Sequence, residues 1–243
     1  MSKQLYYNVP CTLFRDFLKD DSHRQRIFDD VICYVVYAEY LRLQGIETDD
    51  DKRFDLACRN MRCKTNKEDV MEYGPGMMRV YQKEACFSIS SDIYWSFRNE
   101  YHTDEECALF LAWLALKSII GSKPYIKTNN ALWLSRMDGS TQIKKPFSKV
   151  CKTYSPQVER YNSLYRCRRL RALLFDYYHV SFYSDGVRGF YFSLTLDMDD
   201  LVKAVMKRPR TDVIGRLKEA KQKALEAFNH DCNHEFNHDC NLK

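Results

Sequence analysis

The sequence predicts a mainly α-helical fold that carries a small antiparallel β-hairpin. Glycine and proline, which interrupt regular structure, are scarce, with 8 and 6 among 243 residues. Apolar residues recur at three- and four-residue spacing over most of the chain, which is the period of a helix with one buried face. Alternation of apolar and polar residues, the period of a strand, is clearest over 180–196.

The composition is that of a globular chain with a sizeable core. Apolar residues make up 45% and charged residues 29%, which allows one large domain or two small ones and excludes disordered, collagen-like and coiled-coil classes. No apolar run approaches the ~18 uncharged residues of a membrane helix. Residues 1–10 lack the basic-then-apolar order of a secretory signal. We therefore expect a cytoplasmic protein with no membrane partner, whose ten cysteines are reduced thiols.

Residues 1–102 are expected to form a helical N-terminal region. Helical spacing of apolar residues places helices over 12–18, 24–43, 52–62 and 91–101. Pro10 precedes the first of them and Gly45 follows the second. The segment Tyr73-Gly-Pro-Gly76 predicts a turn or a break in the chain.

Residues 103–208 are expected to form a second unit, which opens with the capping-box spacing of Thr103 and Glu106. The helix that follows, 104–120, is apolar nearly all round and should lie at the centre of a core. An extended segment is expected over 125–127, and further helices over 129–137, 155–178 and 198–207.

The clearest local pattern predicts a β-hairpin. Val180 and Phe182 alternate with polar neighbours, and Phe190 and Phe192 do the same in a second run. The turn Asp185-Gly-Val-Arg-Gly189 separates the two runs.

Two further segments follow this unit. Residues 209–227 predict an amphipathic, lysine-rich C-terminal helix. Residues 228–243 contain two near-copies, Phe228-Asn-His-Asp-Cys-Asn-His-Glu and Phe236-Asn-His-Asp-Cys-Asn-Leu-Lys. Histidine and cysteine are zinc-type ligands, but duplication of a short coding stretch explains the near-identity more simply. We expect a disordered tail that binds no metal.

Basic charge is concentrated in the middle of the chain. The net charge is −2 over 1–103, +9 over 104–227 and −2 over 228–243, which gives the overall +5. Between residues 144 and 171, nine basic side chains occur with the single acid Glu159. A segment of this kind attracts a polyanion.

The order of elements from 104 to 196 resembles that of a winged-helix domain: helix, short strand, helix, basic helix, strand, glycine turn and strand. The resemblance is one of topology, and the connection 139–155 is longer than a helix-turn-helix usually has, so an insertion is implied. The resemblance implies that residues 155–171 enter the major groove of DNA and that Arg188 lies at the wing.

The basic segment and the resemblance together nominate nine DNA-binding residues. These are Lys144, Lys145, Lys149, Lys152, Arg160, Arg166, Arg168, Arg169 and Arg188. Guanidinium groups pair with phosphates and with guanine edges. A single exposed cation usually just solvates the surface, so the prediction depends on the clustering rather than on any one residue.

No sequence pattern indicates catalysis or a cofactor. The chain has no phosphate-binding glycine loop, no HEXXH motif and no kinase or hydrolase signature. Asp212, Glu219 and Lys221 have the spacing of a nuclease set, but they fall on a predicted helix of ordinary surface charge. We expect a non-enzyme that holds no cofactor.

The sequence favours a protein that binds double-stranded DNA, either a transcription regulator or the replication initiator of a plasmid or phage, with residues 1–103 serving assembly or effector response. Two alternatives stay open. The first is an interaction or structural protein of a virus or mobile element, because abundant aromatic residues (14%) suit interfaces. The second is RNA binding, with Tyr161 or Tyr165 stacking on bases.

Overall fold

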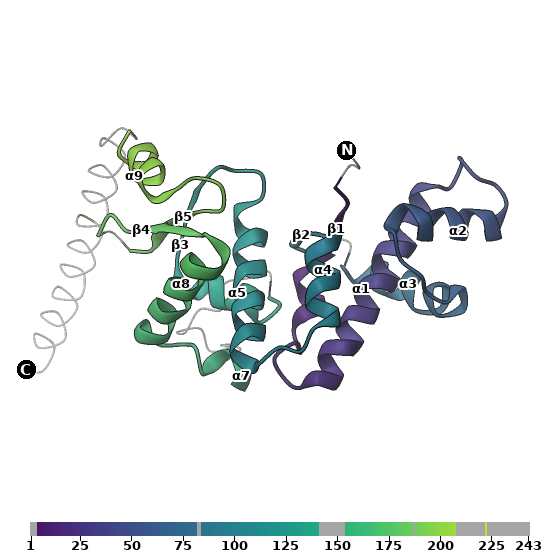
Figure 1. Ribbon diagram of the computed structural model, residues 1–243, viewed down its shortest axis with the longest axis horizontal. Helices are drawn as coiled ribbons and strands as arrows, with labels where there is room; N and C mark the ends of the chain where they lie inside the picture. The colour runs from purple at the N-terminus through teal and green to yellow at the C-terminus, as the bar shows by residue number, and fades with distance from the viewer. Residues whose placement is uncertain (1–3, 82–83, 141–153, 187, 208–221, 223–243) are drawn as a thin grey trace, which may run out of the picture. The chain divides into compact units, whose positions relative to one another are not determined.

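The computed structural model describes residues 4–81, 84–140, 154–186, 188–207 and 222 (Figure 1). The chain divides into two compact units, residues 1–201 and 202–243. The described part is mostly helical with two small antiparallel sheets, which confirms the predicted fold class. The predicted division at residue 102 falls inside the first unit, directly before a helix whose side chains belong to the common core. The predicted helix over 209–227 and the repeat tail 228–243 lie outside the described residues, apart from position 222.

The first hundred residues combine helices with one two-stranded sheet. The elements are β1 (Tyr6–Pro10), the 3-10 turn η1 (Cys11–Phe14), α1 (Asp21–Arg42), α2 (Asp50–Met61), α3 (Lys67–Tyr81), β2 (Cys86–Ser90) and α4 (Ser91–Asn99). Both α2 and α3 pack against α1. The antiparallel pairing of β1 with β2 brings Tyr6 opposite Ser90 and was not predicted from the sequence.

The predicted break at Tyr73-Gly-Pro-Gly76 is wrong, because α3 runs through Pro75 without interruption. Gly74 is buried, and a Cβ added there would lie 2.5 Å from Cγ of Tyr37 on α1. The glycine therefore lets two helices approach closely and does not form a turn. Packing of α3 on α1 stabilises the helix enough to continue past the proline.

The following hundred residues hold the second sheet and the remaining helices. The elements are α5 (Asp104–Ile120), β3 (Ile126–Thr128), α6 (Asn130–Met137), α7 (Pro156–Glu159), α8 (Leu164–Tyr178), β4 (Ser181–Tyr183), β5 (Phe190–Ser193) and α9 (Met198–Met206). The predicted capping box is confirmed, since Thr103 N–H donates to Glu106 Oε2 at 2.8 Å and Glu106 N–H donates to Thr103 Oγ1 at 3.3 Å.

The predicted single helix over 155–178 is wrong. It is divided into α7 and α8 by a turn at residues 160–163. Ser163 has extended backbone angles, and its hydroxyl accepts the N–H of Arg166 at 3.2 Å. A serine side chain competes with the helix backbone for such an N–H group, so the serine starts a new helix instead of continuing the old one.

The predicted hairpin is confirmed and belongs to a three-stranded antiparallel sheet in the order β3-β5-β4. All four residues of the central strand β5 are buried, whereas the sequence predicted one exposed face. The ring of Phe190 meets Trp133 edge-on, with centroids 6.0 Å apart. Tyr191, the neighbouring residue, is flanked by Lys127 on β3 and Tyr183 on β4. The central strand β5 is therefore covered on both faces, so Tyr191 and Ser193 are buried along with Phe190 and Phe192.

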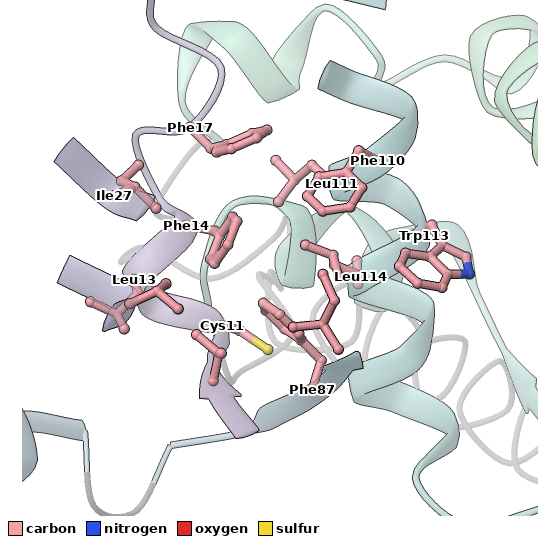
Figure 2. Packing of buried hydrophobic residues seen from close by; sticks show 14 of the residues in the cluster. Cys11, Leu13, Phe14, Phe17, Ile27, Phe87, Phe110, Leu111, Trp113 and Leu114 are labelled. Carbon is pink, nitrogen blue, oxygen red and sulfur yellow. The ribbon is translucent and has the colours of Figure 1, made fainter. Parts of the chain in front are cut away.

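The core is built around α5, which is buried along nearly its whole length. Figure 2 shows Phe14 and Phe17 on one side and Phe110, Leu111 and Leu114 of α5 on the other. Besides η1, the helix packs against β2, α6 and α8, which explains why its sequence is apolar nearly all round. Among the described residues no helix has the length and hydropathy needed to cross a bilayer.

Two glycines of α3 provide a matched test of the helix through Pro75. Gly76→Ala should raise the free energy of unfolding by about 0.5–1 kcal/mol, because the site is exposed, helical and has no neighbour within 4 Å. Gly74→Ala should lower the free energy of unfolding by about 1–3 kcal/mol, because the added methyl group overlaps Tyr37. Urea unfolding followed by circular dichroism measures both values. Destabilisation by Gly76→Ala would show that the chain turns at this point.

Candidate nucleic-acid interface

The helix α8 has one buried side and one broad exposed side. Its residues Cys167, Leu170 and Leu174 are buried, and the helix packs against α5. Of the sequence-predicted candidate segment 155–171, only residues 164–171 belong to this helix.

The apolar and aromatic residues of α8 span a wider sector of the helix than its buried side. Leu164, Phe175 and Tyr177 are 57%, 48% and 71% exposed. A single helix in contact with α5 covers only part of an apolar sector this wide, so its edges stay at the surface.

Five of the nine predicted cations lie in the described part of the chain, and all five are exposed. They are Arg160, Arg166, Arg168, Arg169 and Arg188. The other four, Lys144, Lys145, Lys149 and Lys152, lie outside the described residues.

The turn between α7 and α8 brings two of these arginines together. Arg166 Nη1 donates to the backbone carbonyl oxygen of Arg160. The guanidinium carbon of Arg160 lies 5.1 Å from the ring centroid of Tyr161. A carbonyl and an aromatic ring do not neutralise a positive charge, so the pair keeps its attraction for anions.

Among the five described candidate cations, Arg169 forms an ion pair with an acid. Its Nη2 atom lies 2.7 Å from Oε1 of Glu105 at the start of α5. Both side chains are more than half exposed, at 58% and 56%. An exposed pair of this kind is worth at most about 1 kcal/mol, so Arg169 exchanges readily between Glu105 and another anion.

Arg168 is exposed on α8. Its neighbour one turn on, Arg171, is half-buried, with its guanidinium carbon 4.7 Å from the ring centroid of Phe190 on β5. Burial lowers the pKa of Arg171, and the nearby charge of Arg168 acts in the same direction. Within the described ranges Arg168 forms no ion pair. Arg171 therefore ties α8 to the sheet, and Arg168 remains available to a ligand.

Arg188 is exposed in the turn between β4 and β5. The next residue, Gly189, has φ +99°, and a Cβ there would overlap the carbonyl oxygen of Thr128 on β3, so only glycine fits. The acid of the same turn, Asp185, pairs with Lys127 Nζ at 3.0 Å. As far as the structure is described, Arg188 has no such partner. The hairpin thus presents a cation on a turn whose backbone is held against β3.

A groove of about 380 Å³ separates α8 from the hairpin. Its walls include Arg171, Phe175 and Asp176 of α8, and Tyr183 and Ser184 of the hairpin. Arg168 and Arg169 are both exposed on α8 outside this groove, and Arg169 reaches Glu105 of α5. An α-helix such as α8 fits the major groove of DNA. An arginine on a glycine turn, such as Arg188, can reach a DNA phosphate.

A second polar cluster was not predicted from the sequence. On one face of the sheet, Lys127 Nζ lies 4.9 Å from the ring centroid of Tyr191, which stacks with Tyr183 and lies near Tyr125. The alternation of Tyr125 with Lys127 is the signal that could have indicated this face. Because Asp185 already pairs with Lys127, the cluster strengthens the sheet more than it adds charge to the surface.

The described cysteines behave as buried apolar groups. All seven are free thiols, and five of them are buried. Burial raises the pKa of Cys63 to about 12 and that of Cys107 to about 11, so these thiols stay protonated near neutral pH. No group of three or more histidine, cysteine or acidic side chains suited to a metal occurs in the part of the chain that is described.

No family model, curated protein or solved structure matches this chain.

The contribution of the Arg169–Glu105 ion pair to stability can be measured by replacing Glu105. Glu105→Gln should change the free energy of unfolding by less than about 1 kcal/mol, because both partners are solvated. Glu39→Gln is the matched comparison, since Glu39 is buried between Arg42 and Asn60, and its loss should lower the free energy of unfolding by about 1–3 kcal/mol. Urea titrations of both variants measure the difference. Equal losses would mean that the Glu105 pair is part of the stabilising core.

Proposed function

We propose that the chain is a DNA-binding protein that docks α8 and the β4–β5 hairpin on a duplex in the manner of a winged-helix domain. The observation that carries the proposal is the tie between α8 and the hairpin through Arg171 and Phe190, with Arg168 and Arg188 exposed on the two elements. A helix and a β-ribbon, each with an exposed cation, are the two parts with which a winged-helix domain contacts a groove and the flanking phosphates.

The order of elements supports the same proposal. Helices α5, α6 and α8 accompany a sheet in which the short strand β3 joins the hairpin. This order of helices and strands is compatible with the proposal, and the connection between α6 and α8 also contains α7 and the residues outside the described part. We further propose that the protein is a cytoplasmic, non-enzymatic regulator of transcription or an initiator of plasmid or phage replication.

The proposed contacts have separate roles. Arg168 and Arg188 contact phosphates on either side of the DNA major groove. These contacts release condensed counterions from the DNA and supply most of the affinity. Arg160 and Arg166 extend the contact along the α7–α8 turn. Tyr165, which is 73% exposed on α8, is placed to contact a base edge or a sugar. Arg169 joins the contact when it leaves Glu105.

The proposal predicts salt-dependent binding to duplex DNA. The wild-type chain should bind a labelled duplex at ~50 mM salt. The logarithm of its association constant should fall linearly with the logarithm of the salt concentration. The double variant Arg168→Ala/Arg188→Ala should reduce the magnitude of that slope by roughly two units, about 0.9 for each lost phosphate contact. Fluorescence anisotropy at several salt concentrations measures the slope.

Arg79→Ala is the control for this experiment, because Arg79 is exposed on α3. It should leave the slope unchanged. Removing Arg166 and Arg169 together should flatten the slope by less than the Arg168/Arg188 pair, because Glu105 already neutralises part of that charge. Absence of duplex binding at ~50 mM salt, or equal slopes in all variants, would overturn the proposal.

RNA binding is the second candidate, and the exposure of Tyr165 favours it. A tyrosine on a basic surface stacks on unpaired bases, whereas Tyr161 is half-buried beside Arg160. Competition between single-stranded RNA and duplex DNA separates the two candidates.

The exposed Leu164, Phe175 and Tyr177 keep a third candidate open, a protein-binding surface without nucleic acid. A partner that remains bound after nuclease treatment and at high salt would favour it.

A further inference from the structure

A pocket of about 520 Å³ lies where α4 and the residues after it, the start of α5 and the second half of α8 meet. In Figure 1, α5 stands between α4 and α8. Its aromatic and charged lining includes Phe97, His102, Glu105, Glu106, Tyr177 and Tyr178. Its volume falls in the ordinary range of small-molecule sites, about 300–1,000 Å³.

The aromatic walls of the pocket are held in place by stacking. His102 stacks on Phe97 with ring centroids 3.7 Å apart, and Phe97 stacks on Phe110 of α5 at 3.8 Å. On the α8 side, Tyr178 stacks on Trp113 at 5.0 Å. Burial raises the pKa of Tyr178 to about 12, so its hydroxyl is neutral under physiological conditions. The walls formed by Phe97, His102 and Tyr178 are thus preorganised, which reduces the entropy lost on binding.

The charge in the pocket is negative. Two carboxylates, Glu105 and Glu106, line it, and its lining contains no lysine or arginine. Hydrogen bonds from the backbone N–H and the hydroxyl of Thr103 lower the pKa of Glu106, so this carboxyl is ionised. Arg169 reaches Glu105 from α8, and its own atoms are not part of the lining.

One polar atom of the pocket has no partner within the described residues. Nε2 of His102 is buried and makes no hydrogen bond there. A buried polar atom without a partner costs free energy that a ligand hydroxyl or N–H group recovers. The pocket therefore combines aromatic faces, negative charge and an unused hydrogen-bonding group.

We propose that this pocket binds a small organic cation, an amine or quaternary ammonium that carries an apolar group. Its positive charge lies against Glu105 and Glu106 and over the ring faces of Tyr177 and Tyr178, and its apolar part contacts Phe97 and the leucines of α5 and α8. An anion is repelled by the two carboxylates. A bare metal ion is not favoured, because the described residues contain no group of three or more histidine, cysteine or acidic side chains that could hold one.

The ligand acts on the candidate DNA interface through Glu105. A cation at this carboxylate competes with Arg169, and the released guanidinium joins the exposed surface of α8. This second step rests on the proposed function, whereas the binding site does not. Because coupling between two ligands is reciprocal, the ligand should raise DNA affinity by the same factor by which DNA raises ligand affinity.

The first experiment measures binding without DNA, using the full chain and isothermal titration calorimetry. Benzylamine is the cationic probe and benzyl alcohol its neutral counterpart of similar shape. Benzylamine should bind at one saturable site, with an affinity roughly tenfold higher than that of benzyl alcohol, a difference typical of one favourable charge contact. Glu105→Gln and Tyr177→Ala should each weaken benzylamine binding at least several-fold.

Asp176→Asn is the matched control, because Asp176 is an exposed carboxylate on the same helix and is not part of the lining. It should leave benzylamine binding unchanged. Equal affinity for the two probes, absence of saturation, or binding that none of the pocket variants alters would overturn the proposed site.

The second experiment tests the coupling to DNA. At constant ionic strength adjusted with sodium chloride, saturating benzylamine should raise the duplex affinity of the wild-type chain several-fold and leave that of Arg169→Ala unchanged. A chain that binds DNA with no response to benzylamine would overturn the coupling. A chain that binds benzylamine as expected but no DNA would overturn the proposed function and leave the pocket assignment standing.

Discussion

Burial of α5 on all sides is the constraint on which the rest of the structure depends. Strand β2 and the turn η1 cover one part of it, and α6 and α8 cover others, so elements from both halves of the chain share one core. The capping box of Thr103 and Glu106 sets where the helix begins. The first turn of α5 also supplies Glu105 and Glu106, the two carboxylates of the pocket beside α8.

The position of α8 follows from contacts on its two edges. On one edge Arg171 lies over Phe190 and ties the helix to the sheet; on the other, Arg169 meets Glu105 of α5. The first contact is half-buried and cannot be exchanged for solvent without loss, whereas the second is exposed and easily replaced. A helix held firmly on one edge and loosely on the other can change its exposed charge without moving its backbone.

Local sequence patterns predicted those elements whose own residues decide them. The helix at 104–120 and the hairpin at 180–196 were predictable, because a capping box and a glycine turn each act within a few residues of the chain. The strands β1 and β2 are five residues each and depend on partners some 80 positions apart, so Tyr7 and Val9 could not be recognised as a strand in advance. The continuation of α3 through Pro75 likewise depends on Tyr37 of another helix.

The sequence by itself determined the helical class, the central apolar helix, the hairpin and the excess of positive charge after residue 103, because periodicity, turn residues and charge are local properties. Tertiary structure alone decided which cations are available. Arg168 and Arg169 are adjacent in the chain and both exposed, yet Arg168 forms no ion pair within the described residues, whereas Arg169 pairs with Glu105 of a distant segment. Successive helix positions point about 100° apart, so neighbours in sequence meet different surroundings.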